Sequence, residues 1–351
     1  MNRLRLDERK LLVLSAVVDE YIRTGEPVGS KTIIANSNIN VSSATIRNDM
    51  AALEKMGFLE QPHTSAGRIP TYLGYRLYID RLMHPQALTS QQKREIDHML
   101  AQGGDTVESV LENAVDVLSD VTQLAVVNAN NMLHFSVITK VEVIPAGRKM
   151  YALLMITSTG AVKNKLCHLE FELSDEQIQY FAEFINQNLQ GINVEELTPA
   201  MLQNLAVALG SYMISLSPLL YAVYELGSEF GKNNVHVKGE QKLLEQADSN
   251  SIEIVRFLNK KQELSMLLSN ALSGIEVLFG KENDGFTVTN SSMILTPYQY
   301  DGKQGGSLGV IGPLRLDYAK VIPYMQYFSE SVTKLLAEVT GEHETDKKEE
   351  R

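Results

Sequence analysis

Residues 41–71 constrain the fold of this chain more than any other stretch, because they combine an amphipathic helix with a short segment rich in turn residues. At about 100° per residue, Ile46, Met50 and Leu53 fall within one narrow arc, which predicts a buried apolar stripe. The opposite arc carries small or polar side chains, namely Ala44, Asn48, Ala51 and Lys55. The pattern therefore predicts a slim helix with one face packed on a core and one face open.

The open face has the chemistry of a surface that reads DNA. Small side chains let a helix backbone approach base edges, and an alanine methyl can contact a thymine methyl. Arg47 and Asn48 are the side-chain types that bind guanine and adenine through paired hydrogen bonds. Ser42 or Ser43 is a good N-cap whose hydroxyl could also hold a phosphate. The candidate DNA-binding residues of this helix are Ser42, Ser43, Ala44, Thr45, Arg47, Asn48 and Lys55.

The elements expected around this helix fit a winged helix-turn-helix. Helical spacing predicts a first helix over residues 7–24, ended by Gly25, and a short second helix over residues 30–36. A strand is expected to open at residues 57–59. In this order of elements the third helix enters the major groove and the following loop lies against the DNA backbone or in the minor groove. The alternative is an amphipathic core helix with an alanine-rich exposed side.

The loop after the strand supplies further candidates. Arg68 follows Gly67 at a tip that permits close approach to DNA, so we expect its guanidinium to contact the backbone. His63, Thr64 and Ser65 are expected to add hydrogen bonds to phosphate. The alternative interpretation is a loop that packs on the following helix.

The charge distribution separates this head from the rest of the chain. Residues 1–83 contain 11 Lys+Arg and 9 Asp+Glu, whereas the remainder holds 21 and 34, and the whole chain has a net charge of −11. A strongly acidic body opposes general nucleic-acid binding by repulsion. A nearly neutral head on an acidic body favours binding to one specific DNA site.

The same residues resemble the signature of the HrcA family of heat-inducible transcription repressors. The runs that carry the likeness are Ser-Ala-Thr-Ile-Arg-Asn-Asp-Met at 43–50, Leu-Glu-Lys-Met-Gly at 53–57, Pro-His-Thr-Ser-Ala-Gly-Arg-Ile-Pro-Thr at 62–71 and Gly-Tyr-Arg at 74–76. A second likeness lies at Gly-Ser-Leu-Gly-Val-Ile-Gly-Pro, residues 306–313, with Arg315 and Tyr318. Tyr72-Leu73 departs from the polar, charged pair usual in the family, which puts a phosphate contact there in doubt.

The resemblance implies a dimeric repressor that binds an inverted-repeat operator upstream of chaperonin and chaperone operons. It also implies that the GroE chaperonin maintains the active state. The implied fold is α+β and multidomain, with a winged helix-turn-helix head, a GAF-like antiparallel sheet domain and an inserted, mostly helical dimerisation domain.

The periodicity of the remaining sequence is consistent with that organisation. Strand-like runs occupy residues 124–171, helical spacing continues from residue 174 for nearly a hundred residues, and strand signals return at 275–311 before a final helix. We expect a head at 1–83, a GAF-like domain at 84–173 and 270–340, an inserted dimerisation domain at 174–269 and a charged tail at 341–351. A capping box is expected at Thr89 and Gln92.

The expected dimer contact lies in the insertion, because the head offers no large apolar surface. Residues 216–224 are too apolar for a solvated helix. Either they form the core of the insertion or they face a partner subunit.

The sequence lacks the motifs typical of disulfide-linked, metal-binding, nucleotide-binding and hydrolytic proteins. The single cysteine, Cys167, excludes an intrachain disulfide framework, and the seven histidines show no His-x-x-x-His spacing. No P-loop or Gly-x-Ser-x-Gly motif occurs, and no run of about 18 apolar residues or signal segment is present. We therefore expect a cytoplasmic protein that is no enzyme, with no catalytic, metal or cofactor residues. The alternative function is a ligand-responsive transcriptional sensor whose GAF-like domain binds a small molecule.

Overall fold

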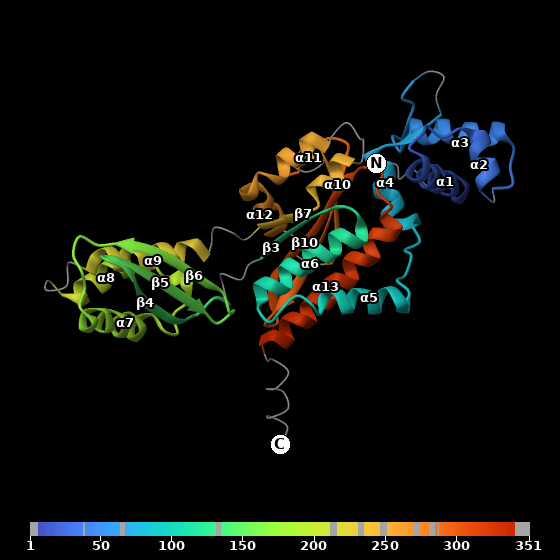
Figure 1. Cartoon of the computed structure of the whole chain (residues 1–351). Coiled ribbons are helices and arrows are strands. Elements are labelled where there is room, and N and C mark those ends of the chain that lie inside the picture. Colours follow the sequence, from blue (N-terminus) through green and yellow to red (C-terminus); the bar gives the residue numbers. More distant parts are fainter. Residues whose placement is uncertain are drawn as a thin grey trace.

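The computed structural model shows an elongated α+β chain built from three parts (Figure 1). It describes residues 6–37, 39–63, 67–130, 135–210, 216–230, 235–245, 251–269, 274–280, 285–286 and 288–340. We call residues 6–83 the head, residues 84–130 with 235–340 the central unit, and residues 135–230 the lobe. The expected α+β class is confirmed, and the expected tail at 341–351 lies outside the described residues. Within the described part of the chain, no helix has the length and apolar character needed to cross a bilayer.

The head consists of three helices, a minimal hairpin and a fourth helix. The elements are α1 (Glu8–Thr24), α2 (Ser30–Asn36), α3 (Ser43–Lys55), β1 (Leu59–Glu60), β2 (Ile69–Pro70), α4 (Tyr72–Leu77) and a π-helical turn (Tyr78–Leu82). Gly25 ends α1 with a φ of 72°, a conformation that favours glycine. The predicted stripe is confirmed, because Ile46, Met50 and Leu53 are at most 4% exposed.

The central unit is a five-stranded antiparallel sheet covered by helices on both faces. Its strand order is β7 (Val235–Lys238), β3 (Ala125–Asn130), β10 (Lys303–Pro313), β9 (Ser291–Tyr300) and β8 (Glu276–Phe279). One face packs against α6 (Val107–Thr122) and α13 (Tyr318–Thr340), with α5 (Ser90–Leu100) lying on α6, and the other face packs against α11 (Ser251–Leu258) and α12 (Lys261–Ser269). A short helix, α10 (Glu240–Glu245), follows β7. The capping box predicted at Thr89 and Gln92 is confirmed at the start of α5.

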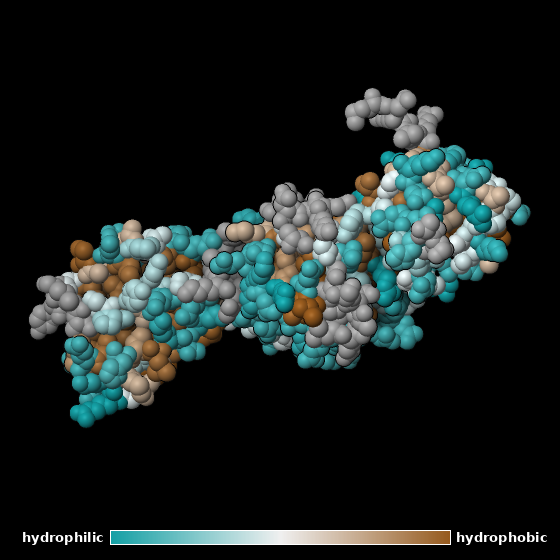
Figure 2. Space-filling model, turned by 90° about the horizontal axis from the view of Figure 1, so that it is seen from above, coloured by the Kyte–Doolittle hydropathy of each residue, from teal (hydrophilic) through white to brown (hydrophobic). Residues whose placement is uncertain are grey.

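The lobe has its own sheet and its own core. Its strands are β4 (Ile138–Gly147), β5 (Met150–Thr157) and β6 (Val162–His168), and its helices are α7 (Asp175–Leu189), a 3₁₀ turn (Val194–Glu196), α8 (Pro199–Leu209) and α9 (Ser217–Phe230). The buried side chains of the sheet pack with those of the helices in a cluster separate from the two clusters that include the central unit, one of which also contains the core of the head. In the space-filling view, apolar residues gather on this lobe (Figure 2).

The expected domain boundaries at 173 and 270 differ from the structure. Strands β4–β6 belong to the lobe rather than to the central sheet, and β7 with α10–α12 belongs to the central unit. The inserted segment is therefore residues 135–230, which lie between two strands that pair with each other, since Ala129 stands opposite Val235. Periodicity predicts that a segment is a strand, but it does not reveal which sheet the strand joins.

The apolar run at residues 216–224 is core of the lobe. Leu216, Leu219, Leu220 and Val223 are at most 2% exposed, whereas Tyr221 is 54% exposed. Since α9 packs on β5 and β6, the run needs no partner subunit to bury its apolar stripe.

Aromatic side chains join the head to the central unit. The rings of Tyr72 and Tyr75 lie 6.0 and 6.3 Å from the ring of Phe279, and Tyr75 also lies 5.8 Å from Tyr318. Arg76 donates a 2.7 Å hydrogen bond to the carbonyl of Val277 and stacks over Phe279. The Tyr72 that departs from the family pattern thus packs at this junction, where its hydroxyl also accepts a hydrogen bond from the backbone of residue 290.

Candidate nucleic-acid interface

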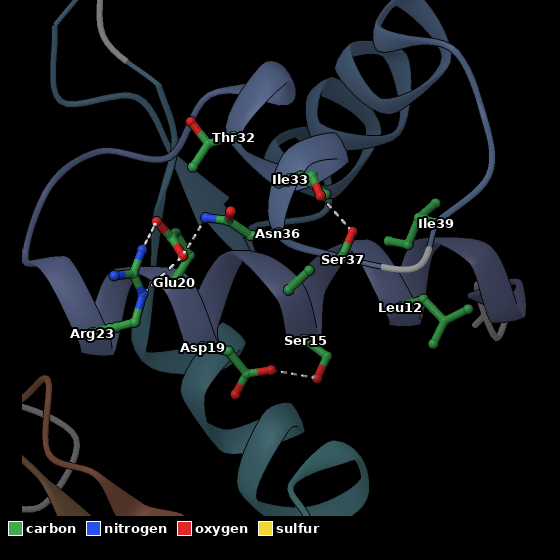
Figure 3. A pocket seen from close by; sticks show the side chains of 11 residues that line it. Leu12, Ser15, Asp19, Glu20, Arg23, Thr32, Ile33, Asn36, Ser37 and Ile39 are labelled. Atoms are coloured by element: carbon green, nitrogen blue, oxygen red, sulfur yellow. Dashed lines mark hydrogen bonds and ion pairs between the residues drawn. The ribbon is translucent and has the colours of Figure 1, made fainter.

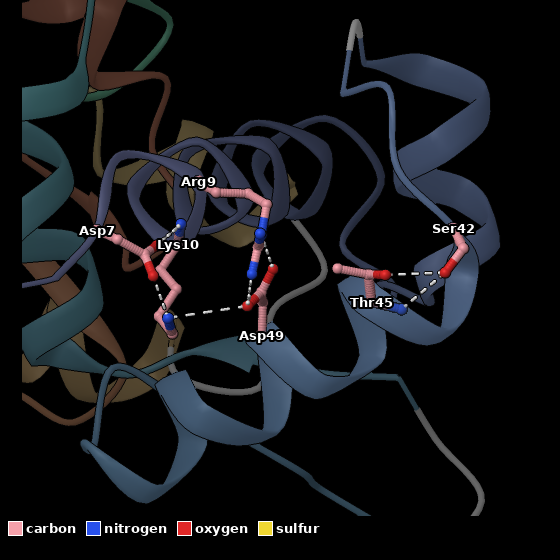
Figure 4. Close-up of polar contacts among 6 residues, drawn as sticks. All are labelled: Asp7, Arg9, Lys10, Ser42, Thr45 and Asp49. Atoms are coloured by element: carbon pink, nitrogen blue, oxygen red, sulfur yellow. Dashed lines mark hydrogen bonds and ion pairs between the residues drawn. The ribbon is translucent and has the colours of Figure 1, made fainter.

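Two serines at the start of α3 have different roles. Ser42 is the N-cap, because its hydroxyl accepts a 3.1 Å hydrogen bond from the Thr45 backbone and lies 2.9 Å from the Thr45 hydroxyl (Figure 4). The Ser43 hydroxyl instead pairs with that of Ser30 on α2, at 2.9 Å. Ser42 is exposed and remains open to a ligand at the helix start, whereas Ser43 fixes α2 against α3.

The outer face of α3 brings most of the predicted residues together. Arg47 and Asn48 are exposed, and neither side chain has a hydrogen-bond or ion-pair partner among the described residues. Ala44 and Lys55 are exposed on the same face, and Thr45 is half-buried beside them. A helix face with two free polar side chains next to an alanine can approach a partner closely and hydrogen-bond to it.

The hairpin is held against the segment that precedes α2. The backbones of Val28 and Arg68 exchange two hydrogen bonds of 2.9 Å. A side chain at Gly67 would put its Cβ 2.3 Å from the Val28 carbonyl oxygen, so this close approach requires glycine. His63 is exposed, and the predicted contacts of Thr64 and Ser65 lie outside the described residues.

The expectation that Arg68 lies at an open tip needs correction. Its guanidinium binds Glu54 of α3, with Nε at 3.0 Å and Nη2 at 2.9 Å from Oε2, and the side chain is only 18% exposed. The backbone pairing with Val28 holds Arg68 on the returning strand of the hairpin, where its side chain reaches α3. Arg68 therefore connects the hairpin to α3 rather than projecting from the hairpin.

A second ion pair on α3 was missed by the sequence analysis. Asp49 is 4% exposed, and its carboxylate receives hydrogen bonds from Arg9 Nε at 2.7 Å and Arg9 Nη2 at 3.1 Å (Figure 4). This interaction with Asp49 raises the pKa of Arg9 above its ordinary value. Lys10 Nζ lies 3.9 Å from Oδ1 of the same carboxylate. The sequence feature that could have predicted this ion pair is the position of Asp49 at the border of the buried stripe, because a buried acidic side chain needs a partner.

A hollow of about 820 Å³ lies between α1 and α2, on the head (Figure 3). Its polar side chains bind one another: Glu20 pairs with Arg23 at 2.6 Å and with Asn36 at 3.1 Å, and Asp19 accepts a hydrogen bond from Ser15 at 3.2 Å. Because these groups are already paired, the hollow does not favour a charged ligand.

A row of acidic residues on α6 faces a row of basic ones. Going along the helix, the carboxylates of Glu108, Glu112, Asp116 and Asp120 pair with Lys163, His236, Lys238 and Lys242 at 3.9, 3.6, 3.0 and 2.8 Å. Glu108, Glu112 and His236 bring three potential metal ligands within 4.8 Å of one another. Each of the four carboxylates thus already has a basic neighbour, and two of these neighbours, His236 and Lys238, lie on the edge strand β7 and connect it to α6.

Comparison with known proteins gives matches over nearly the whole chain. The family described as "HrcA protein C terminal domain" matches residues 108–322. The chain is 30% identical over 338 residues to the "Heat-inducible transcription repressor HrcA" of Halalkalibacterium halodurans, covering 95% of this chain and 98% of that protein. It is 31% identical over 343 residues to the protein of the same name from Acetivibrio thermocellus, covering 96% and 98%.

One solved structure shares the fold. The crystal structure of a hypothetical protein at 2.2 Å resolution superimposes with a TM-score of 0.64 at 23% identity, covering 95% of this chain and all of the other. At this identity the likeness concerns the fold alone.

Proposed function

Because the chain belongs to the HrcA family of heat-inducible transcription repressors, we propose that it represses heat-shock chaperone operons by binding an inverted-repeat DNA operator as a dimer. Members of this family are repressors and not enzymes. The observation that carries the proposal is the outer face of α3, where Arg47 and Asn48 are exposed without partners in the described chain.

In this proposal the head is a winged helix-turn-helix and α3 is its recognition helix. The support is the order of three helices followed by the hairpin of β1 and β2, with the buried stripe of α3 turned away from the open face. An α-helix fits the major groove, where Arg47 suits guanine and Asn48 suits adenine. Ser42 and His63 are both exposed, and in this proposal they contact the DNA backbone.

The proposed function predicts protection of an inverted repeat. In footprints with the purified full chain on the promoter regions of the chaperonin and chaperone operons of the source organism, we expect two protected half-sites about one helical turn or a multiple apart. A promoter in which one half-site is scrambled serves as control and is expected to lose protection at both halves. Absence of protection over all these regions would overturn the proposed function.

The proposed dimer contact is the face of the lobe sheet opposite the one on which α7 and α9 pack. The register places Ile144, Ala152 and Leu166 side by side across β4, β5 and β6, with Val162 opposite Ile156 nearby. Ile144, Leu166 and Val162 are 43%, 65% and 49% exposed. A group of exposed apolar side chains on one sheet face is typical of a protein contact surface.

This placement predicts that Leu166→Glu yields a monomer. A charged side chain in the middle of an apolar interface remains without a partner, which weakens association by several kcal/mol. Val207→Glu on α8 is the matched control, because Val207 is also strongly exposed, at 80%, but lies outside this sheet face. Sedimentation velocity at micromolar concentration should show a monomer for Leu166→Glu and a dimer for Val207→Glu, and the reverse result would move the contact to the helical side.

Two heads are needed because one recognition helix reads only a few base pairs, too few to select one site in a genome. A dimer with twofold symmetry matches an inverted repeat. Family membership is the support for the further proposal that the GroE chaperonin maintains the active repressor.

The second candidate, a ligand-responsive sensor, receives less support. A sensor of this kind needs a polar, enclosed cavity in the sheet domain. Both faces of the central sheet are instead packed with buried apolar side chains, including Val126, Ile294 and Val310 on one side and Val127, Leu295 and Ile311 on the other.

A further inference from the structure

We propose that Arg9, held in place by Asp49, forms a phosphate-binding site that contacts one DNA strand at the flank of α3. This inference rests on the proposed function and adds a binding residue from a different helix. It concerns the N-terminal turn of α1, which lies against α3 through the ion pair described above (Figure 4).

The position of Asp49 on α3 places this site beside the DNA-facing side chains. At about 100° per residue, Asp49 and Glu54 lie roughly 100–120° to either side of the direction shared by Ala44 and Asn48. The two acidic residues therefore mark the two flanks of the recognition face. Each of them holds an arginine that comes from another element, Arg9 from α1 and Arg68 from the hairpin.

The flanks of a recognition helix are where DNA phosphates lie. The major groove is about 12 Å wide and a helix with its side chains is about 10–12 Å across, so the two sugar-phosphate backbones run along the sides of the helix. A guanidinium held at the flank is therefore close to a phosphate when the outer face meets the bases.

Arg9 and Arg68 differ in how many of their guanidinium N–H groups remain unpaired and exposed. Arg68 uses Nε and Nη2 on Glu54, its Nη1 points toward the Gly67 carbonyl, and the side chain is 18% exposed. Arg9 uses Nε and Nη2 on Asp49, but its Nη1 has no partner in the described chain and the side chain is 46% exposed. Only Arg9 offers unpaired N–H groups and an accessible cationic surface.

Asp49 acts as a positioning residue for this contact. Its carboxylate is buried, so the ion pair is oriented with the negative end inside the head and the positive end toward solvent. The two-point bond fixes the plane of the guanidinium, which leaves its Nη1 without a partner in the described chain and reduces the side-chain freedom lost on binding phosphate. A lysine at position 9 would keep the charge without this fixed geometry.

The salt dependence of DNA affinity tests the proposal. Arg9→Ala should lower the slope of log K against log salt by about one unit and weaken binding about fivefold near 0.15 M salt, because one phosphate contact is lost. The same change is expected on non-specific duplex DNA, since phosphate carries no sequence information. Arg23→Ala is the matched control: Arg23 is 64% exposed and paired with an acid on the same helix, but at the end that faces the central unit.

The Asp49→Asn variant tests whether Asp49 acts by orienting Arg9 or only through its charge. This variant raises the net charge of the head by one unit, so long-range attraction alone would tighten binding, whereas loss of the positioning carboxylate is expected to weaken it severalfold. Thermal melting accompanies each measurement, and Arg9→Lys replaces Asp49→Asn if the latter does not fold. Arg9→Lys should keep most of the salt slope and still bind more weakly than wild type.

An Arg9→Ala slope equal to that of wild type on both operator and non-specific DNA would overturn the inference. The outcome is distinct from failure of the proposed function, which would appear as equal affinity of the wild-type chain for operator and scrambled DNA. The salt slope measured on non-specific duplex DNA tests the Arg9 contact whether or not the chain prefers the operator.

Discussion

Replacing residues 131–234 with a short Asn-Gly turn should give a folded monomer that has lost high-affinity operator binding. The expectation follows from how the lobe is inserted. β3 and β7 are antiparallel neighbours, and Ala129 stands opposite Val235, so a tight turn can connect them as in an ordinary hairpin. The lobe packs around its own apolar cluster, and among its described residues only the partly buried Phe135 joins either of the two clusters that include the central unit.

The expected loss of affinity is large because the excision removes the proposed dimer contact. Two linked heads turn the second half-site contact into an intramolecular event, which can strengthen binding by roughly 10²–10⁴-fold without any new contact. Sedimentation should show a monomer, circular dichroism should retain the melting of the head and central unit, and footprints should appear only at much higher protein concentration. An excised chain that still sediments as a dimer would refute the placement of the contact in the lobe.

Deletion of residues 174–269 is the informative comparison. These boundaries follow from the sequence alone, but the deletion would strip α7–α9 from the sheet β4–β6 and remove β7 and α10–α12 from the central unit. Exposing the buried faces of two sheets should leave an aggregating chain. The contrast between the two deletions tests the observed insertion boundaries independently of DNA binding.

Local patterns predicted α3 of the head well, because the residue spacing along this helix shows which of its faces is apolar and which is polar. The spacing of Ile46, Met50 and Leu53 predicted the buried stripe, and Gly25 predicted the end of α1. The capping box was predicted in the same way, because Thr89 and Gln92 are close in the sequence. In each case the interacting groups lie within a few residues of one another, so short-range geometry decides the outcome.

Contacts between distant residues could not be predicted in the same way. Arg9 and Asp49 are 40 residues apart, and Arg68 and Glu54 are 14 apart. The spacing of these residues does not predict that the hairpin turns Arg68 toward α3. The assignment of β4–β6 failed for the same reason, since the alternation of β5 between buried and half-buried residues fits any two-faced sheet.

Arg47→Ala and Asn48→Ala should each abolish most of the preference for the operator while leaving the fold and the dimer intact. Each bidentate contact to the correct base contributes about 1–3 kcal/mol of discrimination. A dimer on an inverted repeat carries every substitution twice, so the expected loss is about 2–6 kcal/mol, or roughly 30-fold to 10⁴-fold in the ratio of operator to non-specific affinity. Both side chains are exposed and unpaired within the described chain, so stability should change by less than about 0.5 kcal/mol.

The ratio of affinities distinguishes these residues from the phosphate contact proposed for Arg9. Arg9→Ala is expected to weaken operator and non-specific binding together, whereas Asn48→Ala, which removes no charge, should leave non-specific binding and its salt slope unchanged. Arg47→Ala should lower the ratio as well as the slope, because arginine contributes charge in addition to base contacts. With Arg23→Ala as control, competition titrations against operator and scrambled duplexes measure each ratio. A variant of Arg47 or Asn48 that keeps the wild-type ratio would remove that residue from base recognition and leave the reading of the operator to the rest of the α3 face.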